Sequence, residues 1–167
     1  MNFRKAVEPD ISSIMNIIKQ AQDYFKKQGI DQWQNNYPNL ETILNDIKNK
    51  NGYVLLDDDT IIGTVSVSFD GEKTYRHIYN GKWITNGNYA VVHRLAVDQE
   101  FKRRGLATII MKKTEEICLN RDIHSIRIDT HEENLAMQKL LNKNKFEYCG
   151  IIYLEGGSKR IAFEKIL

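Results

Sequence analysis

"VVHRLAVDQEFKRRGLATIIMKKTEE", residues 91–116, places a β-rich run, a short basic loop and a helical run one after another. The stretch "HSIRIDT", residues 124–130, is β-rich again. A strand, a helix and a second strand in this order predict a βαβ unit, whose strands are parallel and whose crossover is right-handed. We therefore expect one parallel pair of strands inside the sheet.

The segments around this unit predict the other strands and helices. Residues 53–58 and 60–69 are β-rich runs separated by acidic turn residues, which is typical of a hairpin. The chain ends in a second hairpin pattern, so we expect an α/β (α+β) fold with a mixed, mostly antiparallel central sheet flanked by helices. The further expected strands span residues 2–6, 89–97, 146–154 and 159–165, and the expected helices span 8–29, 38–52, 105–120 and 134–144.

Length and composition restrict the kinds of protein that the chain can be. A chain of 167 residues is long enough to bury one core, so we expect a single domain over residues 1–167. The net charge of +2 is too small to indicate a nucleic-acid partner. No apolar run approaches the roughly 18 residues of a membrane span, and the first ten residues lack a signal-peptide core, so we expect a cytoplasmic protein without membrane contact. Cys118 and Cys149 lack metal-ligand spacing and indicate packed, reduced thiols with no metal site.

Three consecutive cations, Lys102, Arg103 and Arg104, stand immediately before Gly105 at the start of the expected helix. The unpaired backbone N–H groups of a first helical turn can bind an anion, and neighbouring cations add charge-assisted hydrogen bonds. A pyrophosphate fits this description. The alternative is a solvated charge run, and the loop is neither a Walker loop nor a G-x-G-x-x-G turn.

Asn134 opens the next expected helix, just beyond the end of the second parallel strand, and Phe146 follows 12 residues later. An asparagine here is by default a helix N-cap. The carboxyl ends of parallel strands are also where open α/β sheets bind ligands. Asn134 is therefore a second candidate ligand contact.

These two segments resemble a known family. The basic loop is similar to the coenzyme A signature of GNAT-type N-acetyltransferases, R/Q-x-x-G-x-G/A between a strand and a helix, and residues 134–146 are similar to their N-x(11)-F segment. The resemblance covers residues 91–150 and implies a GNAT-like acyl-CoA N-acyltransferase fold with acetyl-CoA as donor. It also implies the residues that would bind acetyl-CoA. These are Leu95, Ala96 and Val97 along the pantetheine arm, Lys102, Arg103, Arg104, Gly105, Leu106, Ala107 and Thr108 around the pyrophosphate, and Asn134 on the next helix.

The sequence departs from the family pattern at three positions. Lys102 stands where Arg or Gln is usual, which keeps the charge but loses the guanidinium fork. Lys145 replaces a frequent glycine before the phenylalanine. Leu141 occupies the position where many relatives carry a tyrosine that protonates the leaving thiolate, so the acid must come from elsewhere or be absent.

Acetyl transfer needs a base, because an ammonium with a pKa of about 10 is mostly protonated at neutral pH. His93 precedes the segment implied to pair with acetyl-CoA, and some relatives place a histidine base here; the alternative is a packed strand histidine. His131, at the end of the second parallel strand, either moves a proton or organises its loop. Tyr148 and Tyr153 are the candidate acids, although tyrosines in such strands often fill a sheet face. A strand bulge near Leu95 would aim a backbone amide at the thioester carbonyl.

The acceptor side is expected in the least regular segments. Trp33 and Tyr37 lie between the first two helices, and Tyr79 lies in the polar segment 70–88, where aromatic residues either wall a pocket or form a minor hydrophobic cluster. The predicted function is therefore acetyl transfer to a primary amine, of a small molecule or a peptide, by direct attack in a ternary complex. We expect a monomer or homodimer.

Two other classes of function compete with this prediction. A non-catalytic acyl-CoA-binding sensor would keep the loop and Asn134 without a working base and acid. A nucleic-acid-binding module could use "FKRR" with nearby aromatic residues, but a chain with 24 cations and 22 anions lacks a broad basic surface.

Overall fold

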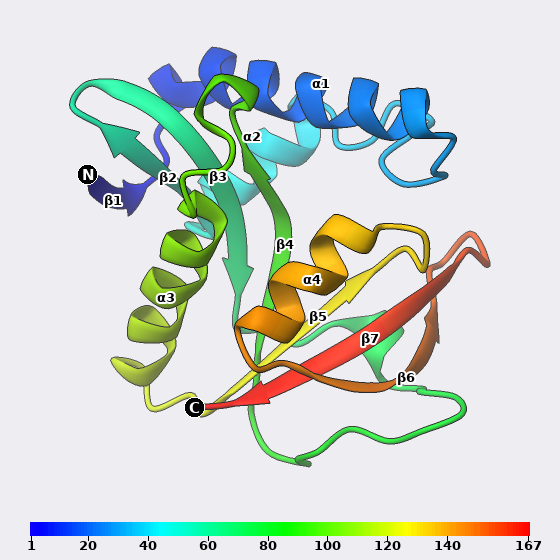
Figure 1. The fold of residues 1–167 in the computed structure, drawn as a ribbon. Helices are drawn as coiled ribbons and strands as arrows, with labels where there is room; N and C mark the ends of the chain where they lie inside the picture. The colour runs from blue at the N-terminus through cyan, green and yellow to red at the C-terminus, as the bar shows by residue number, and fades with distance from the viewer. The chain divides into compact units, whose positions relative to one another are not determined.

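The computed structural model describes residues 1–167, which form four α-helices and seven strands (Figure 1). The helices are α1 (Ile11–Gln28), α2 (Leu40–Lys48), α3 (Leu106–Leu119) and α4 (Leu135–Lys143). The strands are β1 (Asn2–Lys5), β2 (Gly52–Asp57), β3 (Thr60–Ser68), β4 (Ala90–Val97), β5 (Ser125–Thr130), β6 (Glu147–Tyr153) and β7 (Lys159–Ile166). Three 3₁₀ turns are η1 (Glu8–Asp10), η2 (Lys73–Tyr75) and η3 (Gln99–Phe101).

The strands form one mixed sheet in the order β1-β2-β3-β4-β5-β7-β6. β4 and β5 are parallel, with Ala90 opposite Ile126 and Val91 opposite Arg127. The pairs β1–β2, β2–β3, β5–β7 and β6–β7 are antiparallel. The prediction of a mixed, mostly antiparallel sheet with one parallel pair is confirmed.

The chain groups into two compact units, and β4 contributes to both. The first unit contains residues 1–67 and 93–113, and the second contains residues 68–92 and 114–167. The single domain over residues 1–167 stays a prediction.

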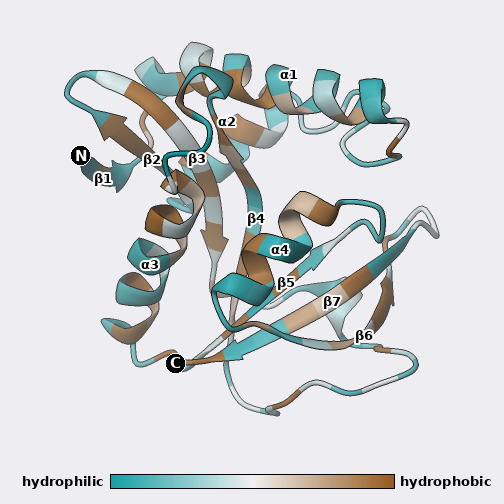
Figure 2. Ribbon diagram, in the orientation of Figure 1, coloured by the Kyte–Doolittle hydropathy of each residue, from teal (hydrophilic) through white to brown (hydrophobic).

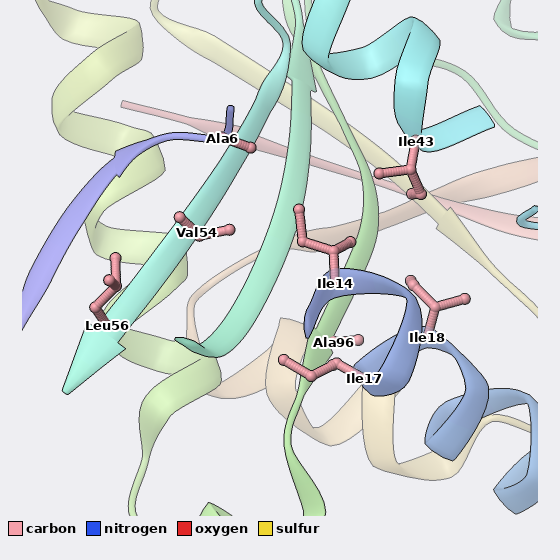
Figure 3. Packing of buried hydrophobic residues seen from close by; sticks show 8 residues of the cluster. All are labelled: Ala6, Ile14, Ile17, Ile18, Ile43, Val54, Leu56 and Ala96. Atoms are coloured by element: carbon pink, nitrogen blue, oxygen red, sulfur yellow. The ribbon is translucent and has the colours of Figure 1, made fainter. Parts of the chain in front are cut away.

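In the first unit, helices α1 and α2 cover one face of the strands. The isoleucines of α1 recur every three or four residues, so one stripe of the helix is apolar and packs on the sheet. Figure 3 shows this cluster from close by. Its buried members are Ala6, Ile14, Ile17, Ile18, Ile43, Val54, Leu56 and Ala96.

The first half of α3 packs on the opposite face of these strands. A Cβ at Gly63 would lie 2.7 Å from the Cδ1 of Ile110 and 3.8 Å from the Cβ of Leu55, so this face of β2 and β3 meets α3. Because helices cover both faces, β2 and β3 are buried along most of their length and carry long apolar stretches in Figure 2.

Two helix ends define the loop between α1 and α2, residues 30–39. Gly29 ends α1 in the left-handed conformation at φ 68°, which glycine adopts without steric cost. Asn39 caps α2 by accepting a hydrogen bond from the Thr42 N–H at 3.0 Å. The Gln22 side chain donates to the carbonyl oxygens of Tyr37 at 2.9 Å and Pro38 at 3.0 Å, so α1 holds this loop at its far end.

In the second unit, the segment 70–88 is held by a buried carboxylate on β7. Glu164 is fully buried and accepts hydrogen bonds from the Ile84 N–H at 2.6 Å, the Thr85 hydroxyl at 2.7 Å and the Ser125 hydroxyl at 2.6 Å. Burial works against its charge, but these donors and the nearby Arg127 guanidinium hold the pKa of Glu164 below its usual value. The carboxylate is therefore ionised and anchors the segment.

Aromatic side chains complete this anchor. The Arg127 guanidinium lies 4.3 Å from the ring centre of Trp83 and 3.9 Å from that of Tyr89. Tyr75 is buried and donates its hydroxyl to Asp129 at 2.6 Å; burial and the Asp129 charge raise the pKa of Tyr75 well above its usual value. Segment 70–88 thus packs on β5 through ordered polar contacts, and the region predicted only as a polar, irregular connection has a defined structure.

The same segment runs along the outer edge of β6. Tyr79 and Ile151 exchange two backbone hydrogen bonds of 2.8 Å, which satisfies part of an otherwise unpaired strand edge. Gly81 lies so close to β6 that a Cβ there would stand 1.9 Å from the carbonyl oxygen of Cys149. Only glycine allows this approach.

We expect Gly81→Ala to lower the free energy of unfolding by about 1–3 kcal/mol, because the backbone of segment 70–88 must move away from β6. The matched control is Gly87→Ala in the same segment, where a Cβ meets no atom within 4 Å. The control should change stability by less than about 0.5 kcal/mol. Urea unfolding of both variants measures the difference, and equal stabilities would show that Gly81 does not contact β6 as described.

Candidate functional site

The loop that joins β4 to α3 has an unusual backbone. After η3, Arg103 and Gly105 adopt positive φ angles of 68° and 72°. Lys102, Arg103, Arg104 and Gly105 are all exposed, whereas Leu106 is buried and begins α3. The loop therefore presents both its charges and its backbone to solvent.

Aromatic residues hold two of the loop cations. The Lys102 ammonium lies 4.9 Å from the ring centre of Tyr24 on α1, and the Arg104 guanidinium lies 5.1 Å from that of Phe101. Such cation–π contacts restrict where the charge can lie without neutralising it. The positive charge of the loop is thus partly preorganised.

The residues present fit a pyrophosphate. The backbone ladder of α3 starts with the Ile109 N–H, which donates to the carbonyl oxygen of Gly105 at 3.1 Å. The N–H groups of Gly105, Leu106 and Ala107 precede this bond and lack an intrahelical acceptor. A Cβ at Gly105 would meet no atom within 4 Å, so an anion can approach the backbone directly.

β4 carries the second unusual backbone feature of the first unit. Arg94 has a φ of 55°, and it is the one non-glycine residue within a strand that adopts the left-handed conformation. A left-handed residue interrupts the regular strand and turns the following peptide out of register. This irregularity of β4 at Arg94, called the bulge below, lies one residue before Leu95, where a bulge was considered from the sequence.

The Arg94 side chain is held by three partners. Its Nε and Nη2 donate to the two carboxylate oxygens of Asp46 on α2 at 2.7 and 2.6 Å, and Nη2 also lies 3.2 Å from the Ser66 hydroxyl. Nη1 donates to the Tyr37 hydroxyl at 2.9 Å. Burial disfavours the charge, but hydrogen bonding to Asp46 raises the pKa of Arg94 above its usual value.

The sequence predictions missed Arg94 and Asp46. A carboxylate within the apolar pattern of α2 is the signal that could have found them, because a buried acid needs a partner. The predicted Tyr37 belongs to this network, whereas the predicted Trp33 does not. Trp33 packs edge-to-face on Phe25 with ring centres 5.7 Å apart and joins the core cluster under α1.

The other predicted residues of the first unit lie where the sequence placed them. His93 is half-buried on β4 and directly precedes the left-handed Arg94. Leu95 and Val97 are half-buried, and Ala96 faces the core with Ile17. The first unit thus brings together His93, the bulge and the basic loop along one continuous stretch of chain.

The remaining predicted residues belong to the second unit. Asn134 is buried and caps α4, with its side-chain oxygen accepting from the Met137 N–H at 3.1 Å. The His131 Nδ1 accepts from the Glu133 N–H at 3.1 Å, so this ring organises the turn before α4. Tyr148 is 55% exposed on β6 and packs edge-on against Phe163, and Tyr79 is 51% exposed beside Tyr153.

Other chemistries have less support. Cys118 and Cys149 are free and buried, and burial raises their thiol pKa values to about 12 and about 11. Both thiols are therefore neutral at pH 7 and poor nucleophiles. No group of three or more His, Cys, Asp or Glu side chains could hold a metal ion, and no helix has both the length and the apolar character to span a membrane.

Comparisons with known proteins identify the family and the fold. A family model described as "Acetyltransferase (GNAT) family" matches residues 16–146. The crystal structure of a GNAT-family acetyltransferase from Streptococcus agalactiae is 34% identical, with a TM-score of 0.90 over 99% of this chain and 95% of that chain. No curated protein gives a significant match.

Two more distant structures share the fold. Ribosomal-protein-alanine N-acetyltransferase from Brucella melitensis is 18% identical, with a TM-score of 0.73 over all of both chains. The protein yncA of Salmonella typhimurium, proposed as an acetyltransferase and solved with its cofactor acetyl-CoA, is 13% identical, with a TM-score of 0.72 over 100% of this chain and 94% of that chain.

We expect Gly105→Glu to weaken coenzyme A binding roughly 100-fold, because it puts a carboxylate where two charge-assisted hydrogen bonds would form. The matched control is Gly157→Glu in the turn between β6 and β7. Gly157 also has a positive φ, of 85°, and open space around its Cα. Calorimetry should show near-normal affinity for the control, and equal affinities in both folded variants would refute the anion site.

Proposed function

We propose, from the premise that this chain belongs to the acetyltransferase (GNAT) family, that it transfers the acetyl group of acetyl-CoA to a primary amine by direct attack in a ternary complex. The chain is a GNAT-family acetyltransferase, and the GNAT fold implies acetyl-CoA as donor. The observation that carries the finer proposal is the order of features along residues 93–108. A histidine, a left-handed strand residue and a helix start preceded by three exposed cations follow one another within a single unit.

The donor would be held by backbone groups more than by side chains. The N–H groups of Gly105, Leu106 and Ala107 would bind the pyrophosphate, and Lys102, Arg103 and Arg104 would attract it electrostatically. Leu95, Ala96 and Val97 would run beside the pantetheine arm, with Thr108 and Asn134 as further contacts. The buried position of Asn134 and its use as a helix cap favour a positioning role over a chemical one.

The chemistry would proceed at the bulge. The amine nitrogen forms a bond to the thioester carbon, and the carbonyl electron pair moves onto oxygen, where the Leu95 N–H donates a hydrogen bond. The C–S bond then breaks, the thiolate leaves with the electron pair, and the surplus amine proton is taken by a base. A proton returned to sulfur gives free coenzyme A.

His93 is the proposed base. It adjoins the left-handed Arg94, and histidine is the side chain that most often serves as a general base in enzymes. His131 is the second candidate, although its hydrogen bond from Glu133 supports the organising role. Tyr148 is the proposed acid, and its side chain is 55% exposed on β6.

A covalent acetyl-cysteine route has less support than direct attack. Both thiols are buried, and their raised pKa values leave almost no thiolate at neutral pH.

The acceptor is an amine of a small molecule or a peptide. Among the residues predicted to contact the acceptor, Tyr37 has the best structural support. The Tyr37 hydroxyl accepts a hydrogen bond from the Arg94 side chain, whose backbone forms the bulge. A cytoplasmic location and a monomer or homodimer stay predictions.

A non-catalytic acyl-CoA sensor is the second candidate. Leu141 is fully buried, so the position that carries an acidic tyrosine in many relatives is part of the core here. A sensor would bind acetyl-CoA without consuming it, whereas a transferase releases coenzyme A only when an amine acceptor is present.

A panel of amines should separate these functions. We expect acetyl-CoA consumption, followed as free thiol, to rise with at least one of spermidine, glucosamine, an aminoglycoside, lysine and short peptides with free N-termini. Mass spectrometry should find the N-acetyl product in equal amount to the coenzyme A released. Tight acetyl-CoA binding with no amine-dependent release would support the sensor instead.

We expect His93→Ala to lower turnover with the best amine of the panel by about 10²-fold or more, the usual scale of general base catalysis. Acetyl-CoA affinity should change little, and the acidic limb of the pH–rate profile should move or vanish. His124→Ala, an exposed histidine beside Asp122, is the matched control and should behave as wild type. If His93→Ala keeps normal turnover and the same acidic limb, the base is another group, and His131 is tested next.

A further inference from the structure

We propose that Arg94 is a positioning residue, whose side chain holds the left-handed backbone of β4 and thereby aims the Leu95 N–H at the thioester carbonyl. This inference rests on the proposed function. In this inference, the orientation of the Leu95 N–H depends on a buried ion pair between Arg94 and Asp46. The same guanidinium also connects the α1–α2 loop to the bulge.

The backbone at Arg94 needs a partner that holds it. A φ of 55° costs free energy for any residue with a Cβ, and such a conformation persists only where the surrounding structure compensates for it. Asn and Asp tolerate it best, and glycine adopts it freely. Arginine has no such preference, so its side-chain contacts are the available source of this compensation.

The ion pair with Asp46 has the geometry to do this. Both carboxylate oxygens accept from the guanidinium, at 2.7 and 2.6 Å, in a forked arrangement that fixes distance and orientation together. The two side chains are only 14% and 12% exposed, so water competes weakly for either partner. The Ser66 hydroxyl on β3 lies within hydrogen-bond distance of both partners, at 3.1 Å from Asp46 and 3.2 Å from Arg94.

The fourth contact extends the network to the α1–α2 loop. Nη1 of Arg94 donates to the Tyr37 hydroxyl at 2.9 Å, and Gln22 holds the carbonyl oxygen of the same residue. A displacement of this loop would therefore act on the guanidinium that holds the bulge. An acceptor that binds beside Tyr37 would therefore contact the same Arg94 side chain that orients the Leu95 N–H toward the thioester carbonyl.

A second ion pair in the same unit provides a contrast. Arg4 on β1 donates through Nη1 and Nη2 to the two oxygens of Asp10, at 2.7 and 3.0 Å. Its backbone is regular, and β2 and β3 separate β1 from β4 in the sheet. Loss of this fork removes an interaction of the same kind without touching the bulge.

Infrared spectroscopy of bound acetyl-CoA, labelled with ¹³C at the thioester carbonyl, tests the inference without any acceptor. In the wild type, a hydrogen bond from Leu95 should shift the carbonyl band to lower wavenumber than in free acetyl-CoA. Arg94→Ala should lose most of that shift while calorimetry shows little change in affinity, because the pyrophosphate loop is untouched. Arg94→Gly should keep more of the shift than Arg94→Ala, since glycine adopts the left-handed backbone without steric cost.

Two further variants complete the test. Arg4→Ala should show the wild-type band. Arg94→Lys keeps a buried charge opposite Asp46 but not the fork, so it should fold even if Arg94→Ala does not, and it should lose part of the shift. An unshifted wild-type band, a full shift in folded Arg94→Ala or Arg94→Lys, or equal losses in Arg94→Ala and Arg94→Gly would overturn the inference. Failure of the wild type to bind acetyl-CoA would instead overturn the proposed function.

Discussion

The forked ion pair between Asp46 and Arg94 is the interaction on which the arrangement of the candidate site depends. It joins a helix, two strands and a loop that lie far apart in the sequence, and it does so at a backbone conformation that most side chains disfavour. A carboxylate buried in α2 is costly unless it is paired, and the guanidinium is costly for the same reason. Each charged group thus offsets the cost of burying the other, and their contacts stabilise the left-handed backbone of β4.

The second unit also contains a buried carboxylate beside an arginine, and there the pair orders segment 70–88. Glu164 on β7 accepts hydrogen bonds from three donors, and the neighbouring Arg127 guanidinium contacts two aromatic rings. These contacts order a long connection that has almost no regular secondary structure. The protein thus combines apolar packing in the first unit with a buried polar anchor in the second, and both support segments that the reaction is proposed to use.

Local patterns were enough to predict the strands, the helices and the basic loop, because hydrophobic period, glycine and charge are read within a few residues of each other. The parallel pair β4–β5 followed from the same reasoning and is confirmed. A bulge was considered near Leu95, but the left-handed Arg94 and its ion pair were missed, because the partner Asp46 lies 48 residues earlier. The hydrogen bond from Ile84 to a carboxylate 80 residues later could not be predicted for the same reason. Trp33, which was predicted to contact the acceptor, also packs with the core cluster under α1.

The position of Tyr79 on the edge of β6 affects how copies of this protein could associate. An exposed strand edge is a template for further strands, and proteins avoid open-ended association by covering or charging such edges. At one end of the sheet, the backbone of Tyr79 already occupies hydrogen-bonding positions of Ile151. At the other end, β1 is only four residues long and carries Arg4 and Lys5. Both ends of the sheet therefore carry features that disfavour open-ended association by sheet extension.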